Sequence, residues 1–460
     1  MSERFNGVVV AGAGPVGLVA ALKIARAGIP VLVLDCEPDI VQWPRAIVYH
    51  APTVEMLDRL GLLEELKVAG ILKQDYQFRT VDGEILAAPH MSVLTPEDTA
   101  YPYNLHMPQH ELASAILRNF LTIPGTAVRW TTRVMDVTQD GDGVTLTTET
   151  GGDTQQLRCD WLVGADGGSS TVRRALGLAF EGYTHPERLV STNLRYDFEA
   201  RGFARANFVI DPVYWAVIVK IDRHGLWRIT YGEDSDLPEE TVRERIADHY
   251  RAILPDDGPY ELEAFAPFRV HERSAVRFRA GRILLAGDAA HVCNPYGGLG
   301  LTSGLLDADL LGDALPAVIK GAAGADLLDR YAQERRRVFL EVTAPTAAEN
   351  IRRLKEADPE KKRADNERFR KLRDDRQFQR EALTFTYKLV GRPIGLPQCL
   401  PSRPMRFVSL PGKGRMTGRG PAPRPLLLRL CSRWRLNCWT SNYSLRIKTD
   451  APSSANHREE

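Results

Sequence analysis

Apolar and polar residues follow a regular pattern along the N-terminal part of the chain. Residues 5–11 and 29–35 are short, almost wholly apolar runs, and residues 15–28 between them are apolar nearly all round until Gly28. Buried strands on either side of a buried helix are typical of a βαβ unit in a parallel sheet, and glycine commonly follows the end of a helix. We therefore predict a strand, a helix and a second strand over residues 5–35.

The pattern changes further along the chain. Over residues 189–231, aromatic and β-branched residues alternate with polar ones, which is typical of an antiparallel sheet with one covered face. Two more apolar runs lead to Asp166 and Asp288 and are predicted to be buried strands. Helical spacing predicts helices over 53–70, 109–121, 238–254 and about 300–320, and over most of the charged stretch 325–390.

The first glycine-rich stretch lies between the first strand and the first helix. Gly12, Gly14 and Gly17 occupy the three positions of a G-x-G-x-x-G motif. Such glycines permit a tight turn, the approach of a pyrophosphate to the backbone, and close packing of helix on strand. Asp35 ends the second strand, where a carboxylate can bind ribose hydroxyls. The motif predicts a dinucleotide site, with a plain glycine turn as the alternative, and it does not distinguish FAD from NAD.

The second glycine-rich stretch, Gly297, Gly298 and Gly300, follows the strand that leads to Asp288. An NAD enzyme needs no second, remote loop of this kind, whereas the ribityl chain and flat ring of FAD extend beyond the first βαβ unit. Asp288 is placed to bind a ribityl hydroxyl, and the positive end of the following helix would stabilise a reduced flavin. We therefore predict FAD; the alternative is a structural aspartate before a helix.

Composition limits the partners. The chain has 460 residues, with 60 Lys and Arg against 59 Asp and Glu and a formal net charge of +1, which predicts two or three domains and no nucleic-acid partner. The six cysteines include no CxxC pair, which favours reduced thiols in the cytoplasm. We recognise no signal peptide and no apolar window near the roughly 20 residues of a membrane span. We expect no membrane partner and no metal site.

Three ordered motifs carry a resemblance to a known family. They are GAGPVG with Asp35, LVGADGGSSTVRRALGL at 162–178, and GRILLAGDAAHVCNPYGGLGLTSGLLDADLL at 281–311. Together they resemble the class A, single-component FAD-dependent aromatic hydroxylases, the para-hydroxybenzoate hydroxylase fold family, over roughly residues 5–395. Two further stretches, which begin at Pro44 and Glu187, look most similar to the para-nitrophenol 4-monooxygenases of that family.

The resemblance implies which residues bind the cofactor, and it assigns no catalytic side chain. The family binds FAD non-covalently, so no bond to Cys293 is expected. His291 is interpreted as a packed residue that fixes the loop, and Arg173 as either a nicotinamide contact or a helix-surface charge. The implied FAD-binding residues are Gly12, Gly14, Pro15, Val16, Gly17, Asp35, Arg45, Gln109, Asp166, Gly287, Asp288, Pro295, Gly298, Gly300 and Leu301.

The resemblance also implies an α/β fold, α+β overall, in three parts. A discontinuous Rossmann-like FAD-binding domain covers 1–75, 101–188 and 270–325. A β-rich substrate-binding domain covers 76–100 and 189–269, and a helical C-terminal region covers 326–400. The basic stretch 401–460 is predicted to be a disordered tail or a non-native reading frame, with binding to nucleic acid or a membrane as a further alternative.

The implied activity is hydroxylation of a phenol. NADPH or NADH reduces the flavin, and the reduced flavin and O₂ form a C4a-hydroperoxide that oxygenates the ring. With a para-nitrophenol-like substrate, attack at C4 would expel nitrite and give a quinone. Hydroxylation of another phenol or aromatic natural product is the main alternative, and a non-hydroxylating flavin oxidoreductase is the second. A homodimer is left open.

The substrate is expected between the β-rich layer and the flavin. Candidate contacts are Tyr214, Trp215, Trp227 and Tyr231, and Arg228 or His224 is the candidate polar anchor. Because successive residues of a strand point to opposite faces, about half of such residues must face away from the substrate. No basic cluster marks a carboxylate site, which favours a neutral or phenolate substrate.

Overall fold

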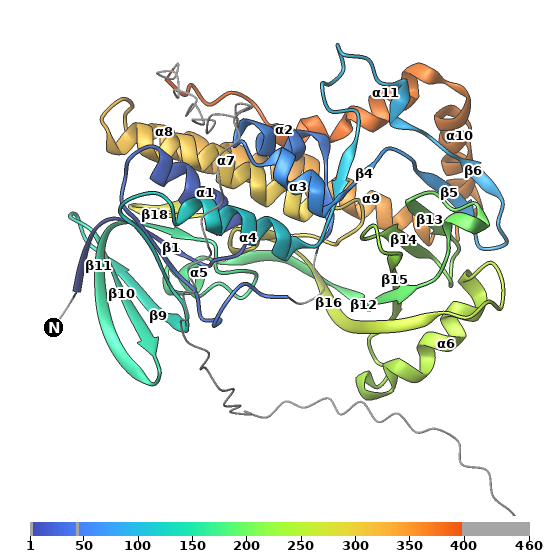
Figure 1. Cartoon of the computed structure of the whole chain (residues 1–460), viewed down its shortest axis with the longest axis horizontal. Coiled ribbons are helices and arrows are strands. Elements are labelled where there is room, and N and C mark those ends of the chain that lie inside the picture. The colour runs from blue at the N-terminus through green and yellow to red at the C-terminus, as the bar shows by residue number, and fades with distance from the viewer. Residues whose placement is uncertain (1–2, 43–45, 398–460) are drawn as a thin grey trace, which may run out of the picture. The chain divides into compact units, whose positions relative to one another are not determined.

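The computed structural model describes residues 3–42 and 46–397 (Figure 1). Arg45 and the stretch 401–460 lie outside the described residues, so the predictions for them stay predictions. Two large sheets and one small sheet are built from the described strands. The predicted mixed α/β class is confirmed.

The first large sheet has a parallel centre in the order β18-β11-β1-β2-β8. Val8, Val9 and Val10 in the middle of β1 are fully buried, because helices cover the sheet. This burial explains the continuous apolar runs and confirms the predicted βαβ unit with α1 (Pro15–Arg26). The strands are β1 (Glu3–Ala11), β2 (Val31–Leu34), β8 (Thr126–Arg129), β11 (Asp153–Gly164) and β18 (Ile283–Leu285), extended by the antiparallel strands β9 (Thr132–Gln139), β10 (Val144–Thr150) and β17 (Arg279–Ala280).

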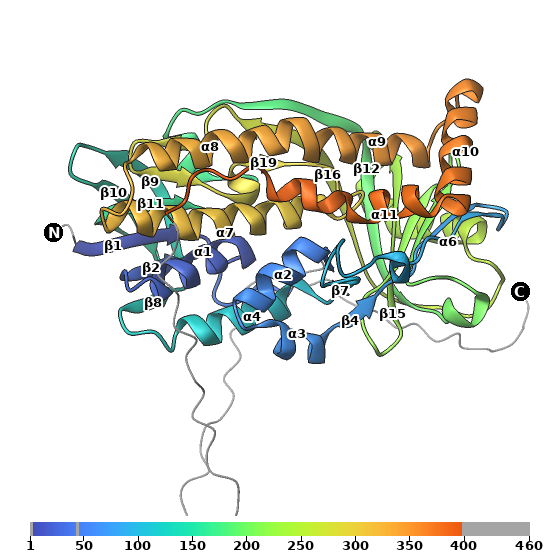
Figure 2. The ribbon, with the colours of Figure 1, turned by 90° about the horizontal axis from the view of Figure 1, so that it is seen from above.

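Helices α1 and α7 (Leu299–Ile319) lie side by side against the first sheet, and α8 (Asp326–Val338) packs on α7 (Figures 1 and 2). α4 (Gln109–Phe120) packs against α1. The prediction of a single helix over 53–70 is wrong. The structure has two helices there, α2 (Ala51–Arg59) and α3 (Leu63–Ala69). Gly61, between them, has φ +69°, a left-handed conformation that ends the first helix.

The second large sheet has the order β19-β16-β12-β15-β14-β13-β5-β6 and is antiparallel apart from the β13–β5 pair. The antiparallel sheet predicted over 189–231 is therefore confirmed. Helix α6 (Val242–Ile253) covers one face. The strands are β5 (Gln77–Thr80), β6 (Ile85–Ala87), β12 (Phe180–Arg195), β13 (Ala206–Ile210), β14 (Ala216–Lys220), β15 (Leu226–Asp234), β16 (Glu261–Ala275) and β19 (His291–Val292).

The domain division stays a prediction. Its boundaries at 188/189 and 269/270 fall inside β12 and β16, which run on without interruption.

A third, small antiparallel sheet consists of β3 (Val48–Tyr49), β7 (Asn104–His106) and β4 (Ile71–Lys73). Along the sequence, its strands lie between strands of the first large sheet and strands of the second.

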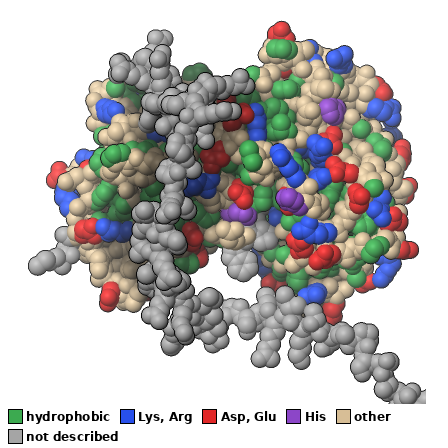
Figure 3. Space-filling model, viewed as in Figure 1, with side chains coloured by type: hydrophobic (Ala, Val, Ile, Leu, Met, Phe, Trp, Pro, Cys, Tyr) green, Lys and Arg blue, Asp and Glu red, His purple; other side chains and the backbone are tan. Residues whose placement is uncertain are grey.

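The C-terminal part of the described chain is helical, as predicted. A π-helical turn, Phe339–Thr343, joins α8 to α9 (Ala344–Leu354), and α10 (Pro359–Asp374) and α11 (Arg376–Thr384) follow. Within the described ranges, no helix has both the length and the apolar character that crossing a membrane requires. Figure 3 shows Lys and Arg side chains interspersed with Asp and Glu over the described part of the face drawn.

Candidate functional site

The predicted cofactor residues gather where parallel strands end. Asp288 follows β18, Asp166 follows β11, Gly12 follows β1 and Asp35 follows β2, and these four strands are neighbours in that order. Ligands of open α/β sheets bind at this carboxyl edge. The sheet therefore brings together residues that lie far apart in the sequence.

The glycines of the first loop differ in whether the surrounding protein leaves room for a side chain. A Cβ on Gly17 would lie 2.0 Å from the Gly12 carbonyl oxygen, and one on Gly12 would lie 2.3 Å from the Ala165 carbonyl oxygen. A Cβ on Gly14 would meet no protein atom within 4 Å. Gly12 and Gly17 are thus needed for packing, whereas Gly14 leaves open space in front of α1.

Helix α1 begins in a way that suits an anion. Its N-cap is Gly14, no side chain caps it, and Pro15 occupies its first turn. The first backbone N–H groups therefore receive no side-chain acceptor, and they carry the positive end of the helix dipole. Asp35 borders this loop, since its Oδ2 accepts from the Ala13 N–H at 2.6 Å and its Oδ1 from the Glu37 N–H at 2.9 Å. Each carboxylate oxygen keeps a second lone pair for a ribose hydroxyl.

The side chains of Asp166 and Arg173 form hydrogen bonds with other residues of the protein. The Asp166 Oδ2 accepts from the Thr171 N–H at 2.7 Å, which places the carboxylate at the start of the short helix α5 (Thr171–Ala175). Arg173 is 5% exposed and donates to the carbonyl oxygens of Ala289 and Gly168 at 2.8 and 2.7 Å. The interpretation of Arg173 as a helix-surface charge is therefore wrong, because this guanidinium links the loops that follow β11 and β18.

The loop that follows β18 touches the first glycine-rich stretch. Gly287 has φ +60°, and a Cβ there would lie 3.0 Å from Val16 Cγ1 at the start of α1. The next residue, Asp288, is exposed. Helix α7 has Gly298 as its N-cap, with φ +66° and no capping side chain, so it too begins with free N–H groups.

The other predicted contacts of this region lie near that helix start. Pro295 is exposed, Gly300 and Leu301 are partly buried, and Gln109 is the first residue of α4. The strand before α4 pairs with β3, and the Met107 N–H donates to the Ile47 carbonyl at 3.0 Å. Gln109 therefore lies close in the fold to Ile47, the residue before β3.

A buried ionic network behind Gly287 was missed by the sequence analysis. Asp307 of α7 accepts from the Gly287 N–H at 3.0 Å, from His291 Nε2 at 2.7 Å and from Arg335 Nε at 2.6 Å. All three side chains are at most 1% exposed. Burial alone would raise the pKa of Asp307, but the attraction of His291 and Arg335 holds that pKa below its usual value. The available signal was an aspartate among apolar residues of the same helix.

His291 is packed, as predicted. Its ring lies between those of Phe278 and Phe339, at centroid distances of 5.7 and 4.5 Å. Because His291 also holds Asp307, it fixes the loop through a bond as well as through packing.

Of the four predicted substrate contacts, Tyr214 and Tyr231 pack on the ring of His249 in α6, at centroid distances of 5.5 and 3.7 Å. Trp227 and Tyr231 belong to the buried cluster beneath α6, where the Trp227 ring lies 5.0 Å from Phe198. Trp215 packs instead against Tyr296. Tyr214, in the turn before β14, is 41% exposed.

The alternate residues of β15 point to the opposite face. Arg228 and Thr230 are buried there, and Arg228 Nε donates to Asn193 Oδ1 at 3.0 Å. His224, the other candidate anchor, is exposed in the turn before β15.

The face of β14 that points away from α6 is apolar. Val219 and Ile221 pack there with Ile47, and Val48 and Tyr76 border the same cluster, which we call the inner cluster. A Cβ on Gly298 would lie 3.2 Å from Val48 Cβ, so the inner cluster adjoins the start of α7.

Comparison with known proteins decides the family. The family described as FAD binding domain matches residues 6–346. The chain belongs to this family. A para-nitrophenol 4-monooxygenase of Pseudomonas sp. (strain WBC-3) is 46% identical over 395 residues, 85% of this chain and 98% of that protein.

Two further relatives agree. The 6-hydroxy-3-succinoylpyridine 3-monooxygenase HspB of Pseudomonas putida (strain DSM 28022 / S16) is 40% identical over 82% of this chain and 96% of that protein. The crystal structure of p-nitrophenol 4-monooxygenase PnpA from Pseudomonas putida DLL-E4 has a TM-score of 0.82 at 45% identity, covering 85% of this chain and 100% of that chain. The family resemblance is confirmed: this is a FAD-dependent monooxygenase of the aromatic hydroxylase type.

The residues present fit FAD. The open space at Gly14 and the uncapped start of α1 suit a pyrophosphate, and exposed Asp288 at the next loop can accept a ribityl hydroxyl. Cys293 lies beside this loop, but burial raises the pKa of its thiol, so it is held as a thiol and not as a nucleophilic thiolate. This protonation is consistent with the predicted non-covalent cofactor.

A buried amine lies next to the inner cluster. Lys73 of β4 is fully buried, and its Nζ has no hydrogen-bond partner among the described residues. The amine lies over the ring of Tyr76, and burial holds its pKa well below the usual value for lysine.

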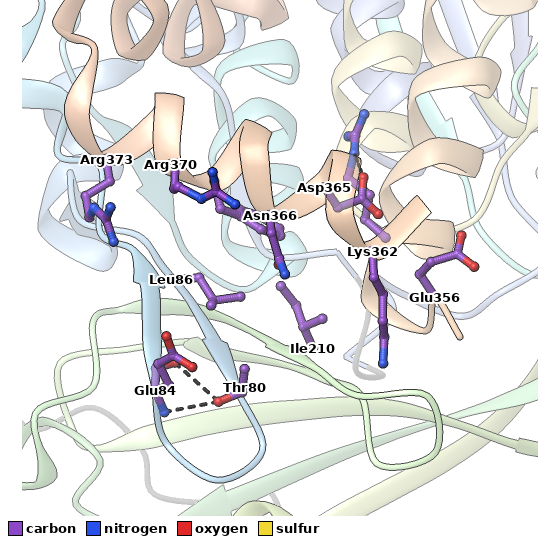
Figure 4. A pocket seen from close by; sticks show the side chains of 12 residues that line it. Thr80, Glu84, Leu86, Ile210, Glu356, Lys362, Asp365, Asn366, Arg370 and Arg373 are labelled. Carbon is purple, nitrogen blue, oxygen red and sulfur yellow. Dashed lines mark hydrogen bonds and ion pairs between the residues drawn. The ribbon is translucent and has the colours of Figure 1, made fainter. Parts of the chain in front are cut away.

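A cavity of about 350 Å³ lies elsewhere, between α10 and the β5–β6 hairpin (Figure 4). Leu86 and Ile210 form part of its apolar wall, and Lys362, Glu356 and Asp365 are among the charged side chains that line it. None of the residues predicted for the cofactor or the substrate lines this cavity.

Proposed function

We propose that this monooxygenase hydroxylates a small phenol, using NADPH or NADH as reductant and O₂ as oxidant. Bound FAD would supply the hydride and oxygen chemistry. The protein binds and orients the aromatic ring and keeps water away from it. The inner cluster carries this proposal, since it is a buried apolar cluster that adjoins the Gly298 start of α7.

We further propose a phenol of the para-nitrophenol type, oxygenated at the carbon that bears the nitro group, with nitrite released. The supporting observation is the 46% identity with a para-nitrophenol 4-monooxygenase over almost that whole protein. A hydroxylated pyridine is the second candidate, because a 6-hydroxy-3-succinoylpyridine 3-monooxygenase is 40% identical.

The experiment uses FAD-loaded enzyme without oxygen. NADPH and NADH are mixed with it in the presence of 4-nitrophenol, other phenols and 6-hydroxypyridines, and the rate of flavin bleaching is followed. We expect a phenol to accelerate reduction, and admission of air to give oxygenated product, which for 4-nitrophenol is a quinone with one nitrite released. If no hydroxylated ring accelerates reduction or gains oxygen, the proposal is wrong.

We propose that the predicted cofactor residues contact FAD, with Asp288 on the ribityl chain. Asp288→Ala should therefore lose FAD during purification, whereas Asp153→Ala, an exposed aspartate at the far end of β11, should retain it. The ratio of flavin to protein absorbance measures both. A stoichiometrically yellow Asp288→Ala protein would contradict the assignment of this residue.

A homodimer in the cytoplasm, with the predicted division into cofactor and substrate domains, completes the proposal. Cys36, Cys159 and Cys293 are free thiols, which suits a reducing compartment. Size-exclusion chromatography with light scattering tests the dimer.

A further inference from the structure

Tyr76 presents an unused hydrogen-bond donor beside the inner cluster. Its ring packs against that cluster and is partly exposed, and its hydroxyl oxygen accepts from Asn104 Nδ2 at 2.7 Å. An amide nitrogen only donates, so the hydroxyl hydrogen of Tyr76 still needs an acceptor. No described residue supplies one: the neighbouring carboxylate of Asp75 accepts from the Arg205 N–H instead.

Burial keeps this hydroxyl protonated. It raises the pKa of Tyr76 further above neutrality, against the smaller opposing effect of Asn104. Tyr76 therefore remains a donor over the whole range in which an enzyme works. A buried donor without an acceptor costs free energy, which is a reason to expect a ligand atom there.

The orientation of Tyr76 is linked to the second glycine-rich loop. Asn104 also lies beside the ring of His50, and His50 Nε2 donates to the Gly297 carbonyl oxygen at 2.6 Å. A carbonyl only accepts, so Nε2 carries the hydrogen. Burial lowers the pKa of His50 to about 4, so the ring is neutral near pH 7. A continuous chain of contacts, with hydrogen bonds at both ends, thus runs from Gly297 to Tyr76.

We propose that Tyr76 orients the substrate by donating its hydroxyl hydrogen to the oxygen of the bound phenol or phenolate, with Asn104 and His50 as positioning residues. This inference rests on the proposed function. The aromatic ring of the substrate would lie on the inner cluster, and its oxygen would satisfy the remaining donor. Because Gly297 and Gly298 precede α7, the same chain fixes the substrate oxygen relative to the cofactor loop.

The proposal distinguishes a phenol from its ether. A phenolate oxygen is a strong acceptor, and a hydrogen bond to a charged group contributes more than one to a neutral group. A methyl ether has the same ring but a weaker and more crowded acceptor. Loss of the Tyr76 hydroxyl should therefore weaken binding of 4-nitrophenol far more than binding of 4-nitroanisole.

The test measures binding to FAD-loaded enzyme, without NADPH, by the change in flavin absorbance on titration. For Tyr76→Phe we expect the 4-nitrophenol dissociation constant to rise by at least about tenfold, the 4-nitroanisole constant to change less than about twofold, and FAD content to stay the same. Tyr196→Phe is the matched control, because Tyr196 belongs to the cluster beneath α6 and its hydroxyl donates to Asp256 Oδ1 at 2.7 Å. It should bind both probes as the wild type does.

Asn104→Ser leaves the Tyr76 ring in place and tests the chain independently, should Tyr76→Phe fail to hold FAD. It should weaken 4-nitrophenol binding. The double variant should bind 4-nitrophenol only slightly more weakly than Tyr76→Phe alone, because both changes remove the same interaction. Equal weakening of both probes, or unchanged 4-nitrophenol binding in Tyr76→Phe and Asn104→Ser, would overturn the role of Tyr76. Failure of the wild type to bind or oxygenate any phenol would instead overturn the proposed function.

Discussion

The parallel sheet and the antiparallel sheet of this monooxygenase contribute to the site in different ways. At the parallel sheet the contributing groups lie at strand ends, and much of what matters is backbone, as at Gly12, Gly14 and Gly287. At the antiparallel sheet the contributing groups are side chains of alternate residues on one face, such as Val219 and Arg228.

This difference separates three kinds of position. A side chain added at a strand end obstructs the backbone or the cofactor. With the substrate on the inner face, as proposed, a change on that face of the antiparallel sheet should alter what the substrate touches, and a change on the α6 face should alter packing alone. The first three of four predictions, in order of falling effect, test whether these kinds of position are separate.

The largest effect is expected at Gly17. In Gly17→Val the Cβ would lie 2.0 Å from the Gly12 carbonyl oxygen, so α1 cannot pack on β1. We expect no bound FAD and a large fall in melting temperature, measured by flavin absorbance and thermal unfolding. Gly141→Val is the control, because a Cβ there meets nothing within 4 Å. A yellow Gly17→Val protein with the wild-type melting temperature would show that this packing is not required.

The next prediction compares substitutions on the two faces of β14 and β15. Trp227 is 1% exposed beneath α6, and Trp227→Ala should lower the free energy of unfolding by about 3–5 kcal/mol while leaving KM for the phenol unchanged. Val219→Ala, on the inner face, should destabilise less but change KM. Denaturant unfolding and steady-state kinetics measure both. The reverse pattern would mean that the substrate lies on the α6 face.

Gly14 should affect the cofactor and not the fold. Because a Cβ there meets no protein atom within 4 Å, Gly14→Ala should melt like the wild type without FAD. The added methyl group should obstruct the pyrophosphate and raise the FAD dissociation constant by about tenfold, or about 1.4 kcal/mol. Fluorescence titration of FAD measures this, with Gly141→Ala as control. Unchanged FAD affinity would place the pyrophosphate elsewhere.

The smallest effect concerns Lys73 and depends on pH. Its pKa is lowered in the folded protein, so at neutral pH the unfolded chain binds a proton that the folded chain binds less readily. Uptake of this proton on unfolding favours the unfolded state. The effect disappears as the pH rises to the pKa of lysine in the unfolded chain, about 10.4. Lys73→Met should therefore stabilise the protein by about 1 kcal/mol near pH 7.

That gain should shrink as the pH approaches about 10. Melting temperatures at several pH values measure it, with Lys371→Met on the exposed side of α10 as control. A gain that grows with pH would show that the Lys73 amine is charged and paired.

The parallel sheet could be predicted because local sequence determines it. Continuous apolar runs occur where both faces are covered, and Gly12, Gly17 and Asp35 have roles set by the neighbouring backbone. The same local rules missed the break at Gly61, since one glycine within helical spacing does not show that the chain turns.

The inner face could not be predicted because both faces of the antiparallel sheet are buried. Trp227 and Tyr231 alternate with Arg228 and Thr230, and all four have at most 9% exposure, so hydrophobicity does not show which set meets the substrate. The ion pair between Asp307 and Arg335 could not be predicted for another reason. The two residues lie on different helices, and only the fold shows that they are in contact.

Strands β12 and β16 stay paired from Phe180 with Ala275 to Arg195 with Glu261, apart from two irregularities, and β16 also pairs with β19 just before the second glycine-rich loop. A hinge at the predicted boundaries 188/189 and 269/270 would have to bend both strands together and break their interstrand bonds. We therefore expect this pair of strands to hold the angle between the proposed substrate ring and the flavin. We expect exchange of substrate and product to come from motion of loops or of the cofactor, and not from bending within this pair of strands.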